Sequence, residues 1–384
     1  MTLSRAQAMA HFDMAIPHAA TSLKQLKDDG AKVVGFYCMF APQEVALAAG
    51  VLPVALCATK EEPIADGEKT LPRNFCPLIK SSYGFAVTDK CPFFLHSDLI
   101  VGETTCDGKK KMFELMAKIK PLHVMNLPQG NGGEADRAYW LAAVRELKDY
   151  LETNFAVEIT DDKLTAAIKE LNAERLLVQE LADLMKHDPV PVSGQDMLKI
   201  LWARNFVFDR REFGNQVREL ISEIKQRVAR GEGALPKGAK RIVVTGVPTG
   251  VGAEKVLKII EDCGAAVVYI ENCAGMKQFV SLVDEGKPAL EAIAEKYLST
   301  HCSCMSPNQR RLELVAEIVR DWRADGVVDI VWQGCHTYNV ESRVLKDYLH
   351  DNGGVPYLHI ETDYSQGDVE QIKTRVQAFL EMMD

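Results

Sequence analysis

The chain has 384 residues, of which 47% are hydrophobic and 26% charged, and its formal net charge is −9. This length suits two or three domains of about 100–200 residues each, and the acidic balance argues against a nucleic-acid partner, whose phosphates attract clustered Lys and Arg. No stretch reaches the roughly 18 apolar residues of a membrane span, and residues 1–20 lack the apolar core and cleavage site of a signal peptide. We therefore expect a globular protein of the cytoplasm.

Between about residues 30 and 155, strand-like and helix-like segments alternate. Runs rich in β-branched and aromatic residues predict strands at 33–37, 52–56, 98–104 and 122–127. Helices are predicted at 42–50 and from Pro77 and Asp107 onward. Alternation of this kind indicates a parallel, doubly wound sheet. We assign residues 1–155 to a first α/β domain.

Long helices with few strand candidates follow, from about residue 134 to 230. Thr160, followed by two aspartates, is a typical helix start, because its hydroxyl can cap the first turn and the acids favour the positive helix end. The stretch 231–241 is rich in Gly, Pro and Lys and marks a boundary. Residues 156–235 are therefore predicted to form a helical connector.

A second α/β domain is predicted over residues 236–384. Its strands are expected at 241–246, 265–270, 327–332 and 355–360, and its helices from residue 252 and at 288–298, 309–322, 341–350 and 368–382. This order fits a flavodoxin-like sheet, in which ligands bind beyond the carboxyl ends of the strands. Two such sheets facing each other would enclose an interdomain cleft.

Ten cysteines stand out in a chain with no sign of export. Disulfides are rare in a reducing cytosol, so this surplus points to metal binding, catalysis or buried thiols. Buried thiols are the expectation for Cys57 and Cys263, which lie in apolar or helix-terminal surroundings. By contrast, four cysteines directly follow predicted strands of both domains, which predicts that they converge on one crevice: Cys38, Cys106, Cys273 and Cys335.

The remaining cysteines occupy loops. Cys76 and Cys91 are each followed by proline, which favours the first position of a helix and places the positive helix end beside the thiol. Cys302 and Cys304 lie in the turn-like segment HCSCMSPN. The spacings match neither a zinc ribbon nor a bacterial ferredoxin, but they remain compatible with an iron–sulfur cluster whose ligands come from distant loops.

Several segments carry a family resemblance that covers nearly the whole chain after residue 30. FYCMFAPQEVALAAGVLPV, LPRNFCPLIKSSYG, SDLIVGETTCDGKKKMFE and WQGCHTYNVES resemble the 2-hydroxyacyl-CoA dehydratase D-component family. Within it, DKCPFF and CDGKKK look most like the double-cubane cluster proteins, also described as double-cubane anaerobic reductases. The resemblance implies a homodimer that receives electrons from a separate, ATP-hydrolysing iron–sulfur activator protein.

The resemblance also implies ligands. Cys76, Cys106 and Cys335 match the three thiolates that hold a four-iron cubane throughout the family. A double-cubane [8Fe-9S] cluster needs six thiolates, because each cubane has one iron on the bridging sulfide and three irons to be bound by protein. The other three are expected among Cys38, Cys91, Cys273 and Cys304, with Cys302 set aside because it lies two residues from Cys304. The favoured metal set is Cys38, Cys76, Cys91, Cys106, Cys304 and Cys335.

The function expected from the resemblance is a low-potential iron–sulfur reductase acting on a small substrate. Two alternatives stay open: a 2-hydroxyacyl-CoA dehydratase or acyl-CoA reductase subunit with one [4Fe-4S] cubane, and a non-catalytic electron-transfer protein. His336 and Glu44, near predicted strand ends, are the candidate proton donors. Each has an equally simple structural role as a cap or cleft-wall residue. The segment GVPTGVGAEK lacks the Gly-Lys-Ser/Thr ending of a phosphate loop, so ATP hydrolysis would belong to the partner.

Overall fold

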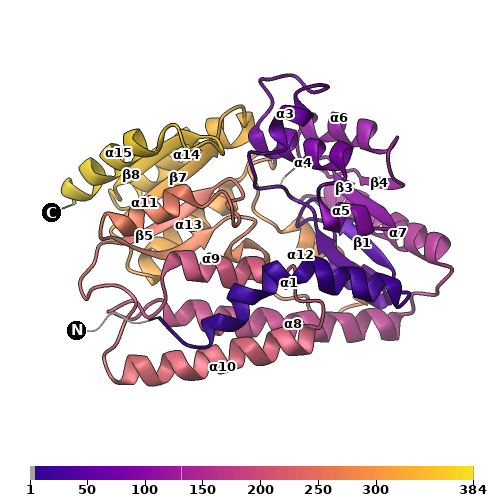
Figure 1. Cartoon of the computed structure of the whole chain (residues 1–384), viewed down its shortest axis with the longest axis horizontal. Helices are drawn as coiled ribbons and strands as arrows, with labels where there is room; N and C mark the ends of the chain where they lie inside the picture. The colour runs from indigo at the N-terminus through magenta and orange to yellow at the C-terminus, as the bar shows by residue number, and fades with distance from the viewer. Residues whose placement is uncertain (1–4, 131, 384) are drawn as a thin grey trace.

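The computed structural model describes residues 5–130 and 132–383, and this part of the chain contains two four-stranded parallel sheets (Figure 1). Their strand orders are β2-β1-β3-β4 and β6-β5-β7-β8, the flavodoxin-like order, so the predicted fold class is confirmed. The strands are β1 (Val33–Phe36), β2 (Leu52–Ala55), β3 (Leu99–Glu103), β4 (Leu122–Met125), β5 (Arg241–Gly246), β6 (Ala266–Glu271), β7 (Gly326–Trp332) and β8 (Tyr357–Thr362). Residues 1–4, 131 and 384 lie outside the described residues. Residues 1–4 belong to the segment 1–20, in which no signal peptide was predicted.

Burial explains why these segments read as continuous apolar runs. The central strands β1 and β3 of the first sheet, and β5 and β7 of the second, are buried along their whole length. The outer strands β4 and β8 are partly exposed. Parallel sheets have helices on both faces, so a central strand needs apolar side chains on each side.

Helices cover both sheets and join them. The first domain contains α2 (Gln43–Ala48), α3 (Ile64–Gly67), α4 (Pro77–Thr88), α5 (Pro92–His96) and α6 (Asp107–Met116). The joining helices are α7 (Glu134–Phe155), α8 (Asp161–Leu184), α9 (Gly194–Ala203) and α10 (Arg210–Ala229). The second domain contains α11 (Lys255–Asp262), η1 (Met276–Phe279), α12 (Ala289–Leu298), α13 (Gln309–Asp321), α14 (His336–Asp351) and α15 (Val369–Glu381). Figure 1 shows α8 running beneath both sheets, with α10 packed against it on the side of the second sheet.

Several elements differ from the sequence expectation. Helix α1 (Met9–Asp28) was not predicted; it packs against α5 and α9. Helix α11 begins at Lys255 rather than at Gly252, because Gly252 has a φ of +103° and cannot belong to a right-handed helix. Helix α14 begins five residues earlier than expected, so that Cys335 becomes its N-cap. By contrast, Thr160 caps α8 as predicted, accepting a 3.4 Å hydrogen bond from the Lys163 amide.

The packing of α12 crosses the predicted domain division. Residues 283–305 lie in the range assigned to the second domain, yet Ile293 and Tyr297 pack in one core with Trp140 of α7 and Leu164 of α8. That core also contains strand β1, so the polypeptide after β6 returns to complete the first domain. As a consequence, Cys302 and Cys304 end beside the first sheet.

The two α/β units also share a continuous apolar interface. One core cluster contains Ile100 and Phe113 of the first unit together with Val244 and Trp332 of the second. Two hydrogen bonds cross the same interface: the Tyr364 hydroxyl donates to the Ala58 carbonyl at 2.9 Å, and the Thr59 hydroxyl donates to the Val251 carbonyl at 2.7 Å. The relative position of the sheets is therefore fixed by packing.

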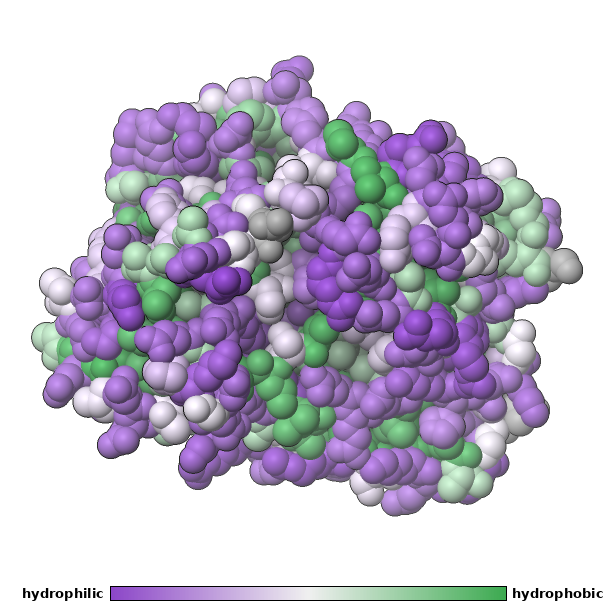
Figure 2. Space-filling view, turned by 180° about the vertical axis from the view of Figure 1, so that it is seen from behind, coloured by the Kyte–Doolittle hydropathy of each residue, from purple (hydrophilic) through white to green (hydrophobic). Residues whose placement is uncertain are grey.

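The surface is mostly polar. On the face turned away from the viewer in Figure 1, hydrophobic residues form separate patches among hydrophilic ones (Figure 2). Within the described residues, no helix has the length and apolar composition to cross a membrane.

Candidate metal centre

A cavity of about 600 Å³ lies between the two units, beyond the carboxyl ends of strands from both sheets. The four cysteines that follow strands all line it, so their predicted convergence is confirmed. All ten cysteines of the chain are free thiols. Those that line the cavity are Cys38, Cys57, Cys76, Cys106, Cys273, Cys302, Cys304 and Cys335.

Three of these thiols sit at helix N-termini. Cys76 caps α4, Cys106 caps α6 and Cys335 caps α14, and each has an extended backbone there. The Cys106 sulfur accepts a 3.4 Å hydrogen bond from the Lys109 amide. Free amide groups at a helix end favour a negative charge on such a sulfur. Local structure thus presents all three thiols to the cavity in the same way.

A glycine allows two of these helix ends, one from each sheet, to approach closely. Gly334, just before Cys335, has a φ of +81°, and a Cβ at that position would lie 2.6 Å from the Asn74 carbonyl oxygen and 3.3 Å from the Cys76 amide nitrogen. A side chain there would therefore push the loop carrying Cys335 away from the loop carrying Cys76. The first and second sheets meet at this point.

Burial outweighs the helix ends in setting the acidity of two of these thiols, Cys76 and Cys335. Together with the neighbouring Cys335 and Cys106, it raises the pKa of Cys76 to about 12. It also raises the pKa of Cys335 to about 11. The thiolates expected from the helix positions alone are therefore disfavoured in the protein by itself. Metal binding would reverse this, because a bound metal displaces the thiol proton.

Four further thiols form a second group. The Cys38 pKa is raised by burial and also by Cys273 and Cys302, and burial raises the pKa of Cys273 to about 12. A hydrogen bond between the side chains of Cys302 and Cys304 lowers the pKa of Cys302 to about 6 and raises that of Cys304. Cys302 also acts on Cys335, so the second group adjoins the first.

Two cysteines are placed otherwise than their sequence surroundings suggested. Cys57, expected to be an ordinary buried thiol, lines the cavity and donates to the Tyr37 carbonyl at 2.6 Å. Cys91 caps α5 after the predicted Cys-Pro start, but it is not among the residues that line the cavity. It neighbours Tyr37, whose pKa is raised by burial and by Cys91 and Cys57.

The two candidate proton donors occupy different environments. His336, the first residue of α14, lines the cavity beside Cys335. Glu44 is fully buried outside it, where its carboxylate accepts hydrogen bonds from Arg175 at 2.6 Å and from the Tyr297 hydroxyl at 2.7 Å. Burial raises the pKa of Glu44, but Arg175, with Lys296 and the Tyr297 hydroxyl, more than offsets this, and the net pKa lies below its ordinary value.

Sequence reasoning missed two buried lysines at the site. Lys109 of α6 lines the cavity and is 7% exposed, and Lys277 of η1 is 5% exposed. Lys109 belongs to a Lys-Lys-Lys run, a pattern typical of a solvated helix face. The position of Lys109 relative to the N-cap could have predicted its place at the site. Lys109 is the third residue after Cys106 and lies in the first turn of α6, close to the thiol.

No group of three His, Cys, Asp or Glu side chains within residues 5–130 and 132–383 is arranged to hold a single metal ion. The thiols around the cavity are spread over loops from both sheets instead. Such a spread suits a multinuclear cluster, in which each thiolate binds a different iron.

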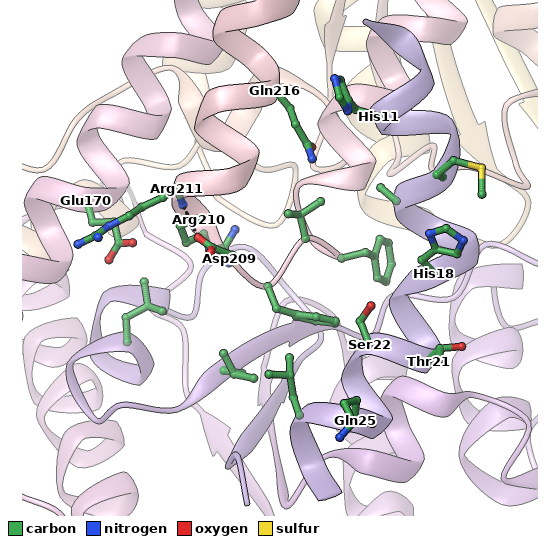
Figure 3. Close-up of a pocket in the computed structure, with 18 of the residues that line it drawn as sticks. His11, His18, Thr21, Ser22, Gln25, Glu170, Asp209, Arg210, Arg211 and Gln216 are labelled. Carbon is green, nitrogen blue, oxygen red and sulfur yellow. Dashed lines mark hydrogen bonds between the residues drawn. The ribbon is translucent and has the colours of Figure 1, made fainter. Parts of the chain in front are cut away.

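A larger hollow of about 1250 Å³ lies elsewhere, between α1 and the start of α10. Figure 3 shows His11, His18 and Gln25 on the α1 side and Arg210 and Arg211 across from them. No cysteine lines it. Size alone therefore does not locate the chemistry, and the smaller cavity is the candidate site because reactive groups from both sheets meet there.

The fold and the cavity define an α/β protein with a cysteine-lined site between two flavodoxin-like units. The family model for the 2-hydroxyglutaryl-CoA dehydratase D-component matches residues 38–383. The chain belongs to this family.

Relatives cover the chain almost completely. The putative dehydratase subunit YjiM of Escherichia coli (strain K12) is 46% identical over 362 residues, covering 94% of each chain. The (R)-phenyllactyl-CoA dehydratase beta subunit of Clostridium sporogenes is 24% identical, again over 94% of each chain. A benzoyl-CoA reductase subunit of Thauera aromatica is 23% identical over 94% of this chain and 93% of its own. The chain is thus similar to dehydratase and reductase subunits.

Proposed function

We propose that this protein is the cluster-bearing component of a low-potential iron–sulfur reductase that acts on a small substrate. The observation that carries the proposal is the set of free thiols from both sheets around one cavity. A volume of about 600 Å³ is within the range of roughly 300–1,000 Å³ that cofactor and ligand sites occupy. When bound, an iron–sulfur cluster would supply electrons at low potential.

The grouping of the thiols favours a double-cubane [8Fe-9S] cluster. Cys76, Cys106 and Cys335 would hold one cubane. Cys38 and Cys273, with either Cys302 or Cys304, would hold the other. The hydrogen bond between Cys302 and Cys304 supports a single ligand from that pair, with the second thiol donating to it. Because Cys91 lies outside the cavity lining, we replace it by Cys273 in the proposed set.

The other residues of the cavity would position a substrate and control its access to water. His336 lies at the cavity wall and is the group we propose to deliver a proton. The buried rings of Tyr37 and Tyr338 restrict solvent on two sides. Glu44, held in its ion pair away from the cavity, has a structural role in this proposal.

The proposal includes a separate ATP-hydrolysing iron–sulfur activator as electron donor and a homodimeric form. The turn after β5 supports the division of labour, since Ala253 and Glu254 follow its last glycine, Gly252, where a phosphate loop has Lys and Ser/Thr. Ten free thiols also suit a reducing compartment, and we propose the cytoplasm.

A second candidate is favoured by the relatives that are named dehydratase and benzoyl-CoA reductase subunits. In that case the chain would be a 2-hydroxyacyl-CoA dehydratase or acyl-CoA reductase subunit, with one [4Fe-4S] cubane on Cys76, Cys106 and Cys335. The Cys38 group would then hold no metal. A non-catalytic electron-transfer protein is the third candidate, distinguished by redox cycling without substrate turnover.

The test is anaerobic purification followed by quantification of iron and acid-labile sulfide per chain. A double cubane predicts eight irons, and a single cubane predicts four, because each cubane holds four. Iron-free protein from strictly anaerobic cells would refute both cluster proposals.

A further inference from the structure

Lys109 carries a buried charge with an unusual lack of counter-charge. Its ammonium group donates a 3.2 Å hydrogen bond to the Tyr37 carbonyl, and within the described residues no carboxylate lies close enough to form an ion pair with it. An ammonium has three donors and is costly to bury unless a negative group faces it. The Tyr37 carbonyl and the Phe113 ring, whose centroid lies 5.8 Å from the ammonium, are uncharged and do not neutralise this charge.

Several thiols line the cavity wall with Lys109, and the Lys109 amide donates a 3.4 Å hydrogen bond to the Cys106 sulfur. Burial lowers the pKa of Lys109, but Cys38, Cys57 and Cys106 together with Glu103 more than offset this, and the net pKa is raised. Burial also raises the pKa of Glu103, whose carboxyl group accepts a 3.2 Å hydrogen bond from the Ala41 amide and forms no ion pair with Lys109. The strong anions available to Lys109 are therefore metal-bound thiolates.

Lys277, the second buried lysine near the thiols, is balanced within the protein. Its ammonium pairs with Glu271 at 3.0 Å and donates to the Tyr338 hydroxyl at 3.2 Å. Arg311 pairs with both Glu271 and Glu341, so two cations meet two carboxylates in that network. Of these two buried lysines, Lys109 is the one without a carboxylate partner, so its charge is available to a bound ligand.

We propose that Lys109 is the positive pole of the cavity and raises the reduction potential of the group that the thiols hold. It neighbours Cys38 of one thiol group and Cys106 of the other, so its charge acts on both halves of a bound cluster. A fixed positive charge stabilises the reduced, more negative state more than the oxidised one, and the effect is large because the site is buried. This inference rests on the proposed function.

The test compares three variants, purified anaerobically with cluster: Lys109→Met, Lys109→Arg and Lys111→Met. Lys111 is a matched control, because it lies on the same helix and at the same cavity, but its side chain is 63% exposed and pairs with Glu114. Iron is counted in each variant, thermal unfolding checks the fold, and the reduced fraction is followed by electron paramagnetic resonance during a redox titration.

We expect Lys109→Met to lower the ratio of reduced to oxidised cluster at least tenfold at a fixed potential, which is a shift of about 59 mV for a one-electron couple. Lys109→Arg and Lys111→Met should stay near the parent. Loss of iron from Lys109→Met but not from Lys109→Arg would also support the proposal that the positive charge of Lys109 acts on the bound cluster. Equal ratios in all proteins, or iron loss from both Lys109 variants, would overturn the inference. An iron-free parent would instead refute the proposed function before any variant is compared.

Discussion

Arg175 of α8 donates a 2.6 Å hydrogen bond to Glu44 of α2, and both side chains are buried. Replacing Glu44 by Ala should leave the guanidinium without its counter-charge and lower the free energy of unfolding by about 3–5 kcal/mol. Urea denaturation of the purified variant measures the change. Normal stability together with lost turnover would return Glu44 to a catalytic role.

A double variant separates the ion pair from the packing around it. Glu44→Leu combined with Arg175→Met removes both charges and keeps much of the volume, so it should recover most of the lost stability. If the double variant is as unstable as Glu44→Ala, then the ion pair itself does not explain the effect.

His336→Gln tests the proposed proton donor. Since His336 lines the cavity without belonging to the thiol set, the variant should keep the iron content of the parent. Substrate turnover should fall roughly 10²–10⁴-fold, the usual contribution of a general acid. Iron analysis and steady-state kinetics on the same preparation measure both effects, and a fall in iron would instead indicate a structural role for the histidine.

The sorting of the cysteines can be tested through iron content. Cys335→Ser should lose the iron of at least one cubane, because it removes a thiol that faces the cavity. Cys263→Ala, at the end of α11 and outside the cavity lining, should lose none. Cys91→Ser is expected to behave like Cys263→Ala. Substantial iron loss from Cys91→Ser would restore it to the ligand set.

Gly334→Ala should weaken the site by separating the two sheets. The new Cβ would strike the backbone of residues 74–76, so both iron content and unfolding temperature should fall. Gly354→Ala is the matched control, because Gly354 also has a positive φ (+65°) but no atom lies within 4 Å of the position that its new methyl group would take. Equal iron in the two variants would contradict the close approach.

Stability should depend on pH through Lys296 of α12. Burial, aided by Arg175 and Arg204, lowers its pKa from 10.5 to about 7. Between these two pH values the unfolded chain binds more protons at this residue than the folded protein, so its contribution to the free energy of unfolding rises with pH, by at most about 1.4 kcal/mol per pH unit. Lys296→Met should remove this part of the slope in denaturation series from pH 7 to 10.

A control for the pH series is Lys287→Met, near the start of the same helix. Lys287 is 46% exposed and pairs with Glu295 at the surface, so the slope of the parent should persist in this variant. An unchanged slope in Lys296→Met would show that Lys296 keeps its proton in the folded state.

Local sequence determined the elements and their order. Strands β5 and β7 are runs of β-branched residues that suit a doubly covered sheet, and they were predicted almost residue for residue. The Cys-Pro pairs likewise predicted the helix starts after Cys76 and Cys91. Because parallel strands present their carboxyl ends at one edge, topology brings together the strand-end cysteines of each sheet, and the packing of the two units then joins the two pairs.

Contacts between distant segments decided the rest. The sequence favoured Cys91 over Cys57 as a ligand, yet the packing of the two units places Cys57, and not Cys91, at the cavity. Lys109 and Lys111 are neighbours in one basic run, but the turn of α6 buries the first and exposes the second. Glu44 follows a strand as a catalytic residue would, and Arg175 of α8 makes it part of an ion pair instead. Burial and charge pairing depend on partners far away in the chain, which no local pattern records.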